Sequence, residues 1–313
     1  MPVFDPGQAP PPPTMGDMPF MPDDAQAPME NGTPSQPTPT AIPAKKTAEA
    51  EVVTGRMTVG DPDQLGISMI LYGPEKWGKT TFGAFAPNSV IYLAPRELGY
   101  LTLQRAKTVP ESDCAKIDTW EGLKSQMRRI AQADHVEHRN IVLDALTGLE
   151  AMLHKYVCDK HYEGNWGPKG FMSYREGYET SVEEWRLFLD ILDEIKFRGI
   201  NVILLGHSQV KTFNNPAGPD YDRYVCDIHP KTWSPTSKWA DVILFGTYKT
   251  AVDTGKAAAK ASDKGKGIAG TKRIVYTERC DAYDAGSRFQ IPRAIDIPND
   301  HTKVWETITK HFL

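Results

Sequence analysis

The stretch GPEKWGKT, residues 73–80, decides the fold. It matches the phosphate-binding loop pattern G-x-x-x-x-G-K-[ST] in full, between an apolar run of strand length at 67–72 and a segment able to start a helix at 80–86. A strand, a glycine-bearing loop and a helix N-terminus direct backbone N–H groups at one point, which suits a polyphosphate. Because context and pattern agree, a chance match in a turn is disfavoured, and the sequence predicts a nucleoside triphosphate site.

Each residue type in this loop has a chemical reason to be there. Gly73 and Gly78 supply backbone shapes that a Cβ would obstruct. Lys79 is expected to reach the β/γ-phosphates, and the Thr80 hydroxyl to hold Mg²⁺. With ATP and Mg²⁺ as the expected ligands, the predicted nucleotide-binding residues are Gly73, Pro74, Glu75, Lys76, Trp77, Gly78, Lys79, Thr80 and Thr81.

Composition divides the 313 residues into two parts. Residues 1–50 hold 13 of the 25 prolines and almost no β-branched or aromatic residues, so they bury too little apolar surface to offset their ordering entropy. They also lack the basic start and apolar stretch of a secretory signal. We expect a disordered Pro-rich tail over 1–56 and one α/β ATPase domain over 57–313.

Charge and cysteine usage narrow the class of protein. The net charge of −4 excludes a general polycation, but residues 249–273 carry seven Lys/Arg against two acids. We interpret about 253–271 as a mobile basic loop, with a solvated linker as the alternative. The four cysteines are far apart and form no C-x-x-C pair, which favours reduced thiols in the cytoplasm. No apolar run approaches 18 residues, so we expect no membrane partner.

Apolar runs alternate with helical patterns along the rest of the chain. Strand-length apolar runs occur at 89–94, 140–144, 201–206 and 241–246, and helical patterns at 120–133, 146–161 and 181–198. Strands that are apolar throughout and alternate with helices predict a mainly parallel sheet with helices on both faces. Residues 245–248 and 273–277 add a predicted C-terminal β-hairpin.

Two acids follow predicted strands of this sheet. Asp144 ends the run 140–144, where P-loop NTPases hold their Mg²⁺-binding acid. Its alternative role is to cap the helix that follows. Glu97 stands just past the run 89–94, where a carboxylate can activate water. Its alternative is a place in the first turn of a helix opened by Pro95.

A polar cluster, residues 206–211, ends the predicted strand at 201–206. Ligands meet the carboxyl edge of a parallel sheet, so His207 or Gln209 is expected to hydrogen-bond the γ-phosphate and to report its loss to the loop 212–224. The alternative is the start of a solvated loop.

The order GPEKWGKT, YLAPRELG, NIVLDALTGL and VILLGHSQVK resembles the RecA-like core. Within it, the chain is most similar to the phage-encoded nucleotide-binding AAA proteins of the single-strand annealing and recombination type. RecA-family proteins have a glutamate after the second strand, an aspartate at the end of the third motif and an Asn-Gln pair at the end of the next strand. Glu97, Asp144 and Gln209 fall at matching places, whereas Ser208 replaces the usual Asn and Ala145 the usual Ser.

The resemblance also implies partners. RecA-like proteins form homo-oligomers with ATP between subunits, and a basic residue of the neighbour completes the site. Arg288, Arg279 and Arg293 are the candidates, and Arg288 is preferred as a catalytic residue beside Lys79. The loop after Gln209 would contact single-stranded DNA through the residues Lys211, Phe213, Tyr221, Arg223 and Tyr224.

The sequence thus predicts an Mg²⁺-dependent ATPase that acts on single-stranded DNA in phage recombination or replication, in the cytoplasm of a bacterial host. One alternative is a helicase-loading or replisome ATPase whose main partner is a protein, such as a single-strand-binding protein. A nucleotide kinase is a further alternative, disfavoured because no Arg-rich lid follows the predicted sheet.

Overall fold

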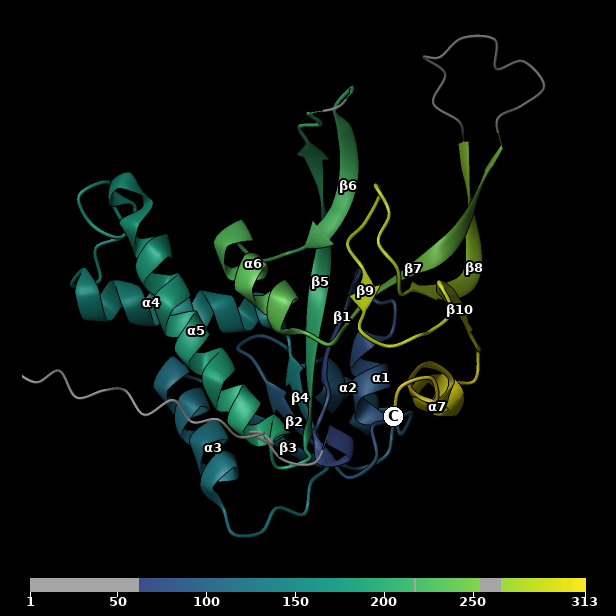
Figure 1. Cartoon of the computed structure of the whole chain (residues 1–313), viewed down its shortest axis with the longest axis horizontal. Coiled ribbons are helices and arrows are strands. Elements are labelled where there is room, and N and C mark those ends of the chain that lie inside the picture. Colours follow the sequence, from purple (N-terminus) through teal and green to yellow (C-terminus); the bar gives the residue numbers. More distant parts are fainter. Residues whose placement is uncertain (1–61, 217, 254–265) are drawn as a thin grey trace, which may run out of the picture. The chain divides into compact units, whose positions relative to one another are not determined.

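A computed structural model of the chain describes residues 62–216, 218–253 and 266–313 (Figure 1). The predicted tail over 1–56 lies outside these ranges, as does most of the predicted mobile loop, from 254 to 265. No helix in the described ranges is long and apolar enough to cross a membrane.

A mixed sheet forms the centre of the described chain, in the order β10-β8-β7-β1-β5-β4-β2-β3. Its strands, together with β6 on β5 and β9 on β7, are β1 (Ser68–Gly73), β2 (Ser89–Leu93), β3 (Asp113–Lys116), β4 (Asn140–Asp144), β5 (Asn201–Phe213), β6 (Tyr221–Cys226), β7 (Val242–Asp253), β8 (Lys266–Tyr276), β9 (Gly286–Ser287) and β10 (Ala294–Ile297). The strands from β7 to β3 in this order are parallel, while β8 and β10 add an antiparallel edge.

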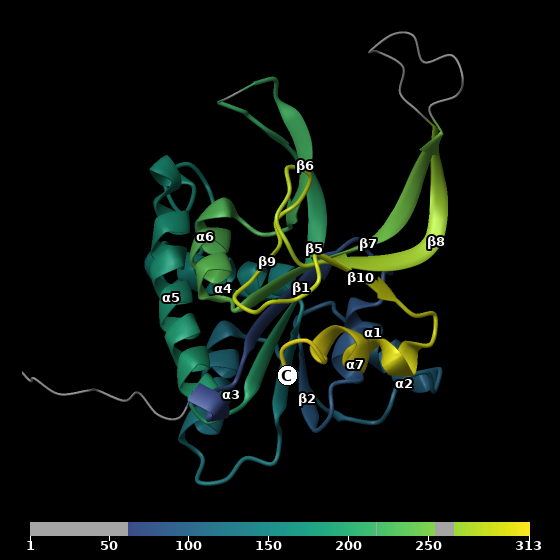
Figure 2. The ribbon, with the colours of Figure 1, turned by 45° about the vertical axis from the view of Figure 1, so that its right-hand side comes forward.

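Helices cover both faces of the sheet, as Figure 2 shows. They are α1 (Lys79–Ala84), α2 (Gly99–Arg105), α3 (Trp120–Gln132), α4 (Leu146–His161), α5 (Glu176–Lys196), α6 (Pro230–Trp239) and α7 (Val304–Thr309), with short 3₁₀ turns at Pro62–Gln64, Ser173–Arg175 and His301–Lys303. Helices α3 to α6 pack on one face, and α1, α2 and α7 on the other.

The central strands are apolar throughout because both of their faces are covered. Every residue of β1 is buried: Ile70 and Tyr72 contact the core on the α3–α6 side, whereas Met69 and Leu71 contact the core on the α1 side. This alternation is the side-chain period of a strand. The predicted α/β class, with a mainly parallel sheet between two helical layers, is confirmed.

The strand registers bring the ends of four strands to the same edge of the sheet. Leu93 pairs with Asp144, Asp144 with Leu205, and Gly73 with His207. The phosphate loop, Glu97 beyond β2, Asp144 at the end of β4 and His207 in β5 therefore share the carboxyl edge, where open α/β sheets meet their ligands.

Two hairpins project beyond this edge (Figures 1 and 2). The predicted hairpin is confirmed as β7 and β8. The second corrects the interpretation of residues 212–224 as a loop, because β5 continues to Phe213 and turns back into β6. Cross-strand contacts explain the extension: Phe213 lies 5.3 Å from Tyr221 between ring centroids, and Thr212 Oγ1 donates to Asp222 Oδ1 at 2.7 Å.

Candidate functional site

The phosphate loop, residues 73–80, connects β1 to α1. Gly73 has no room for a side chain, because a Cβ there would lie 2.2 Å from the carbonyl oxygen of Gly246 in β7. Gly78 has a φ of 112°, in the left-handed region that favours glycine. The two glycines of the motif are therefore required by the backbone of this loop.

Lys79 is buried and folds back over its own loop. Its Nζ donates hydrogen bonds to the carbonyl oxygens of Gly73 and Pro74, both at 2.9 Å. Burial lowers the pKa of the Lys79 ammonium, and the carboxylates of Asp144 and Glu97 oppose that effect. The loop thus holds a cation in a low-dielectric setting, where its attraction to a phosphate is stronger than at an exposed position.

Thr80 and Asp144 form a contact between α1 and the end of β4. Thr80 Oγ1 donates to Asp144 Oδ2 at 2.8 Å. Burial raises the pKa of Asp144 to about 6; the Thr80 hydrogen bond opposes this rise and the charge of Glu97 adds to it. The peptide bond that follows, Asp144–Ala145, is cis.

The oxygen atoms of Thr80 and Asp144 fit Mg²⁺, which is commonly bound by one or two carboxylates with substrate phosphates and water. The described residues contain no group of three or more His, Cys, Asp or Glu placed to hold a metal by themselves. The alternative role of Asp144 as a helix cap is wrong, because Ala145 occupies the N-cap of α4.

Glu97 and His207 form a second pair beside the loop. His207 Nε2 lies 3.3 Å from Glu97 Oε1, and both side chains are partly exposed. The hydrogen bond with His207 lowers the pKa of Glu97, and the charges of His207 and Lys79 act in the same direction. Glu97 precedes α2, whose N-cap is Leu98, so its alternative assignment to the first turn of a helix is wrong.

Gln209 lies two residues beyond His207 on the same face of β5. It does not join the Glu97–His207 pair but lines a separate cavity of about 340 Å³. Thr147, Lys211 and His229 line the same cavity, which opens beside the base of the β5–β6 hairpin. The structure thus separates the two predicted phosphate sensors: His207 pairs with Gly73 of β1, whereas Gln209 lies in the part of β5 that pairs with β6.

The side chain of Trp77 corrects one part of the predicted binding set. It is buried, and its Nε1 donates to the carbonyl oxygen of Thr247 at 2.8 Å. The indole packs against Gly246, where a Cβ would lie 2.8 Å from the ring. Only the backbone of Trp77 can therefore face a ligand. Of the remaining predicted residues, Glu75 and Lys76 are exposed, Pro74 is half-buried and Thr81 is buried in α1.

Sequence reasoning missed Arg273, which lies in β8 behind the loop. Its Nη1 donates to the carbonyl oxygen of Trp77 at 3.3 Å. A tryptophan inside an otherwise polar loop was the one available signal that the loop is anchored from behind. The partner of that anchor, however, is 196 positions away in the sequence.

Each of the three candidate arginines pairs with an acid that lies outside the phosphate loop of its own chain. Arg288 Nη1 donates to Asp241 Oδ1 at 2.7 Å, and Asp241 Oδ2 in turn accepts from the backbone of Ser68, at the amino end of β1. Arg279 and Arg293 are exposed and pair with Asp284 and Glu278, respectively. A role for any of them in trans stays a prediction.

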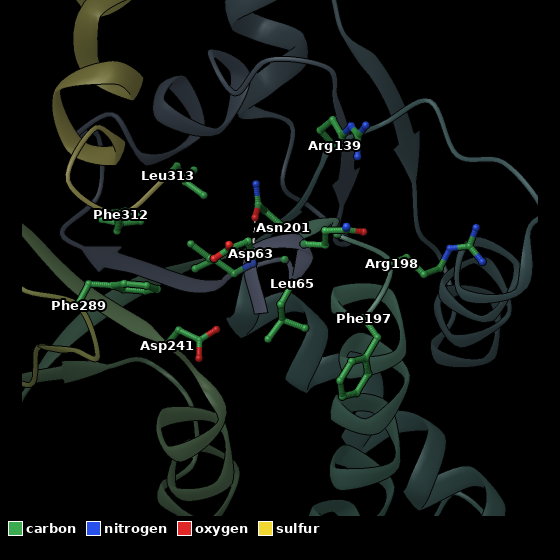
Figure 3. A pocket seen from close by; sticks show the side chains of 14 residues that line it. Asp63, Leu65, Arg139, Phe197, Arg198, Asn201, Asp241, Phe289, Phe312 and Leu313 are labelled. Carbon is green, nitrogen blue, oxygen red and sulfur yellow. Dashed lines mark hydrogen bonds between the residues drawn. The ribbon is translucent and has the colours of Figure 1, made fainter. Parts of the chain in front are cut away.

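A further cavity, of about 940 Å³, opens at the amino edge of the sheet, opposite the phosphate loop. In Figure 3, the side chains of Leu65, Phe289, Phe312 and Leu313 surround it together with Asp241. None of the predicted site residues lines this cavity.

Comparison with protein families gives a direct assignment. Residues 65–289, which include the phosphate loop, Glu97, Asp144 and His207, match the model of an AAA domain. The chain belongs to this AAA domain family. No curated protein sequence matches it.

We compare the chain with two of the solved structures that it resembles. One is the RadB recombinase, with 12% identity over 76% of this chain and 89% of that one and a TM-score of 0.42. The other is the flagellar accessory protein FlaH from Methanocaldococcus jannaschii, with 11% identity over 74% and 85% and a TM-score of 0.34. The family match and the complete phosphate-loop motif together support a P-loop ATPase of the AAA type.

Proposed function

We propose that the protein is an Mg²⁺-dependent ATPase. The observation that carries this proposal is the meeting, at one edge of the sheet, of a buried lysine, a hydroxyl–carboxylate pair and a second carboxylate held by a histidine. These groups correspond to the requirements of phosphoryl transfer: charge for the phosphates, oxygen ligands for the metal and a group that orients water.

Each residue has a defined part in this reaction. Lys79 and the loop N–H groups hold the β/γ-phosphates, while Thr80 and Asp144 hold Mg²⁺. Bound Mg²⁺ supplies charge neutralisation of the phosphate oxygens. Glu97 accepts the proton of the attacking water, since its lowered pKa keeps it ionised at neutral pH. His207 positions Glu97 through their hydrogen bond.

ATP turnover by the purified full chain tests this function. We expect Mg²⁺-dependent release of phosphate from ATP, and in Glu97→Gln retained ATP binding with hydrolysis slowed by roughly 10²-fold or more. Absence of ATP binding by the wild-type chain, measured by titration with a fluorescent ATP analogue, would contradict the proposal. Phosphate transfer to an added nucleoside monophosphate would favour the kinase alternative instead.

We further propose that the β5–β6 hairpin binds single-stranded DNA during phage recombination or replication, in homo-oligomers with ATP between subunits. The support is local: Lys211 is exposed, and Phe213 and Tyr221 form an aromatic pair near the tip. Aromatic rings beside cations suit a stacked, backbone-tracking strand. Arg223 is less available to contact DNA than its sequence position predicts, because it is buried and paired with Asp284.

A protein partner is the second candidate, and the loop between α4 and α5 favours it. Trp166, Met172 and Tyr174 are exposed there, Tyr174 at 96%. Exposed large apolar side chains, aromatic residues and Met in particular, mark surfaces for contact with other proteins. ATPase rates with and without oligothymidine separate the two: DNA-stimulated turnover supports the DNA-acting protein, and unchanged turnover supports the protein-directed one.

A further inference from the structure

Arg273 places a buried positive charge behind the phosphate loop. The residue lies in β8, and only 7% of its surface is exposed. Its Nη1 donates to the carbonyl oxygen of Trp77 at 3.3 Å and its Nη2 to that of Pro298 at 2.7 Å. The guanidinium thus joins the loop to the segment that follows β10.

The contact reaches the residue next to the catalytic lysine. A Cβ built on Gly78 would lie 2.8 Å from Arg273 Nη1, so the guanidinium packs directly against the loop backbone there. The guanidinium carbon also lies 5.8 Å from the centroid of the Trp77 ring. Gly78 immediately precedes Lys79, the cation that we assign to the phosphates.

No carboxylate among the described side chains forms an ion pair with Arg273. Its two hydrogen-bond acceptors are neutral carbonyl oxygens. A buried cation without a counter-charge is costly, because carbonyl dipoles replace only part of the lost hydration. The presence of a cation at this buried position is explained if its counter-charge is an anion that binds to the protein only part of the time.

We propose that Arg273 is a second cation of the phosphate site, acting from behind the loop, whose counter-charge is the polyphosphate of the bound nucleotide. The proposal rests on the nucleotide site proposed above. Arg273 touches the loop and not the ligand, so it is a positioning residue: it fixes the carbonyl of Trp77 and adds positive potential at Gly78 and Lys79. Because that potential acts on charge, it favours a triphosphate over a diphosphate.

Two substitutions separate the charge of Arg273 from its hydrogen bonds. Arg273→Lys keeps the positive charge but cannot donate from two fixed guanidinium nitrogens. Arg273→Gln keeps a neutral N–H donor and loses the charge. Trp77→Phe is the matched control, because it removes the Nε1 bond to Thr247 and leaves Arg273 charged. Arg273→Met is a fourth variant for the case in which Gln does not fold, since an apolar replacement of a buried charge is often tolerated.

The experiment is equilibrium binding of fluorescent ATP and ADP analogues to the full chain, with thermal unfolding of each variant without ligand. We expect Arg273→Gln, or Met, to weaken ATP binding by roughly tenfold or more and ADP binding by a smaller factor. Arg273→Lys should keep most of the preference for ATP. Trp77→Phe should weaken both nucleotides by the same factor.

The outcomes discriminate clearly. Equal weakening of ATP and ADP binding by Arg273→Gln would mean that Arg273 acts only through loop geometry, and so would equal losses of ATP affinity in Arg273→Lys and Arg273→Gln; either result would overturn the proposal. Unchanged ATP binding in both Arg273→Gln and Arg273→Met would overturn it as well. If the wild-type chain binds neither nucleotide, the proposed function itself fails, which is a different result from any of these.

Discussion

Thr80 and Asp144 lie 64 positions apart in the sequence, and a hydrogen bond of 2.8 Å joins them across the carboxyl edge of the sheet. The burial of Asp144 has a cost that this hydrogen bond only partly offsets. Asp144 is 3% exposed, and burial raises its pKa from an ordinary 3.8 to about 6 because the ionised carboxylate has lost most of its hydration. A group that destabilises the ligand-free fold is expected to be retained for its ligand, here the metal ion of the nucleotide.

Asp144→Asn should therefore stabilise the ligand-free protein at neutral pH. The pKa of Asp144 is raised in the folded state, so folding favours its protonated form, and the destabilisation by Asp144 develops as pH rises from 3.8 through about 6. Above that pH window, Asp144→Asn should increase the free energy of unfolding by at most about 3 kcal/mol. Denaturant unfolding with EDTA at pH 8 and near pH 4 measures it; a gain equal at both values would contradict this reading.

The same substitution should impair metal-dependent binding. Asn keeps an oxygen that accepts the Thr80 hydrogen bond but removes the negative charge that attracts Mg²⁺. We expect the Mg²⁺-dependent increase in ATP affinity to be strongly reduced in Asp144→Asn, while metal-free ATP affinity stays equal or rises. A variant that responds to Mg²⁺ as the wild type does would remove Asp144 from the metal site.

The Glu97–His207 pair predicts a shift in the pH profile of hydrolysis. The hydrogen bond from His207 lowers the pKa of Glu97, with a smaller contribution from Lys79. His207→Phe removes that bond, so the pKa of Glu97 should rise and the acid limb of kcat against pH should move to higher pH. The same substitution at His138, a partly exposed residue paired with Asp113, serves as the control and should leave the profile unchanged.

Glu97→Gln tests whether Glu97 accepts the proton of the attacking water during hydrolysis. The amide keeps the size of the side chain and cannot accept a proton, so ATP binding should persist while hydrolysis slows by roughly 10²-fold or more. Single-turnover measurements at saturating ATP test this directly. Hydrolysis at the wild-type rate would assign water activation to another group.

Lys79→Ala should abolish ATP binding and leave the domain folded. The substitution removes two hydrogen bonds to loop carbonyls and also a buried charge; these effects oppose each other, so the free energy of unfolding should change by no more than about 1 kcal/mol. Lys303→Ala, at an exposed lysine outside the phosphate loop, is the control and should keep ATP affinity. Retained ATP affinity in Lys79→Ala would refute the phosphate-loop assignment.

Local patterns in the sequence predict the central layer of the fold well. The bounds of β4 and α4 follow from continuous apolar residues and from helical spacing, and both agree with the structure. The strand β3 was missed because its four residues are mostly exposed and carry no apolar pattern. The helix α6 was missed because Pro235 lies inside it.

Within the site, residues next to a strand end were predictable and residues behind the loop were not. Glu97, Asp144 and His207 each follow an apolar run directly, so the topology of a parallel sheet brings them together. Arg273 reaches Trp77 only because β8 folds back on β7, a long-range pairing that a single sequence does not specify. The extension of β5 into a hairpin depends on cross-strand pairs for the same reason.

The hairpin yields the last prediction, which concerns single-stranded DNA. Lys211 is exposed, so Lys211→Ala should weaken binding to oligothymidine and lower the salt slope by about 0.7, the value for one phosphate contact on a single strand. Phe213→Leu should weaken binding with little change in slope, because a stacking ring carries no charge. Lys303→Ala, an exposed lysine beside α7, is the control and should change neither. Salt-titrated fluorescence anisotropy with ATP present provides the measurement, and no binding at low salt would favour a protein partner.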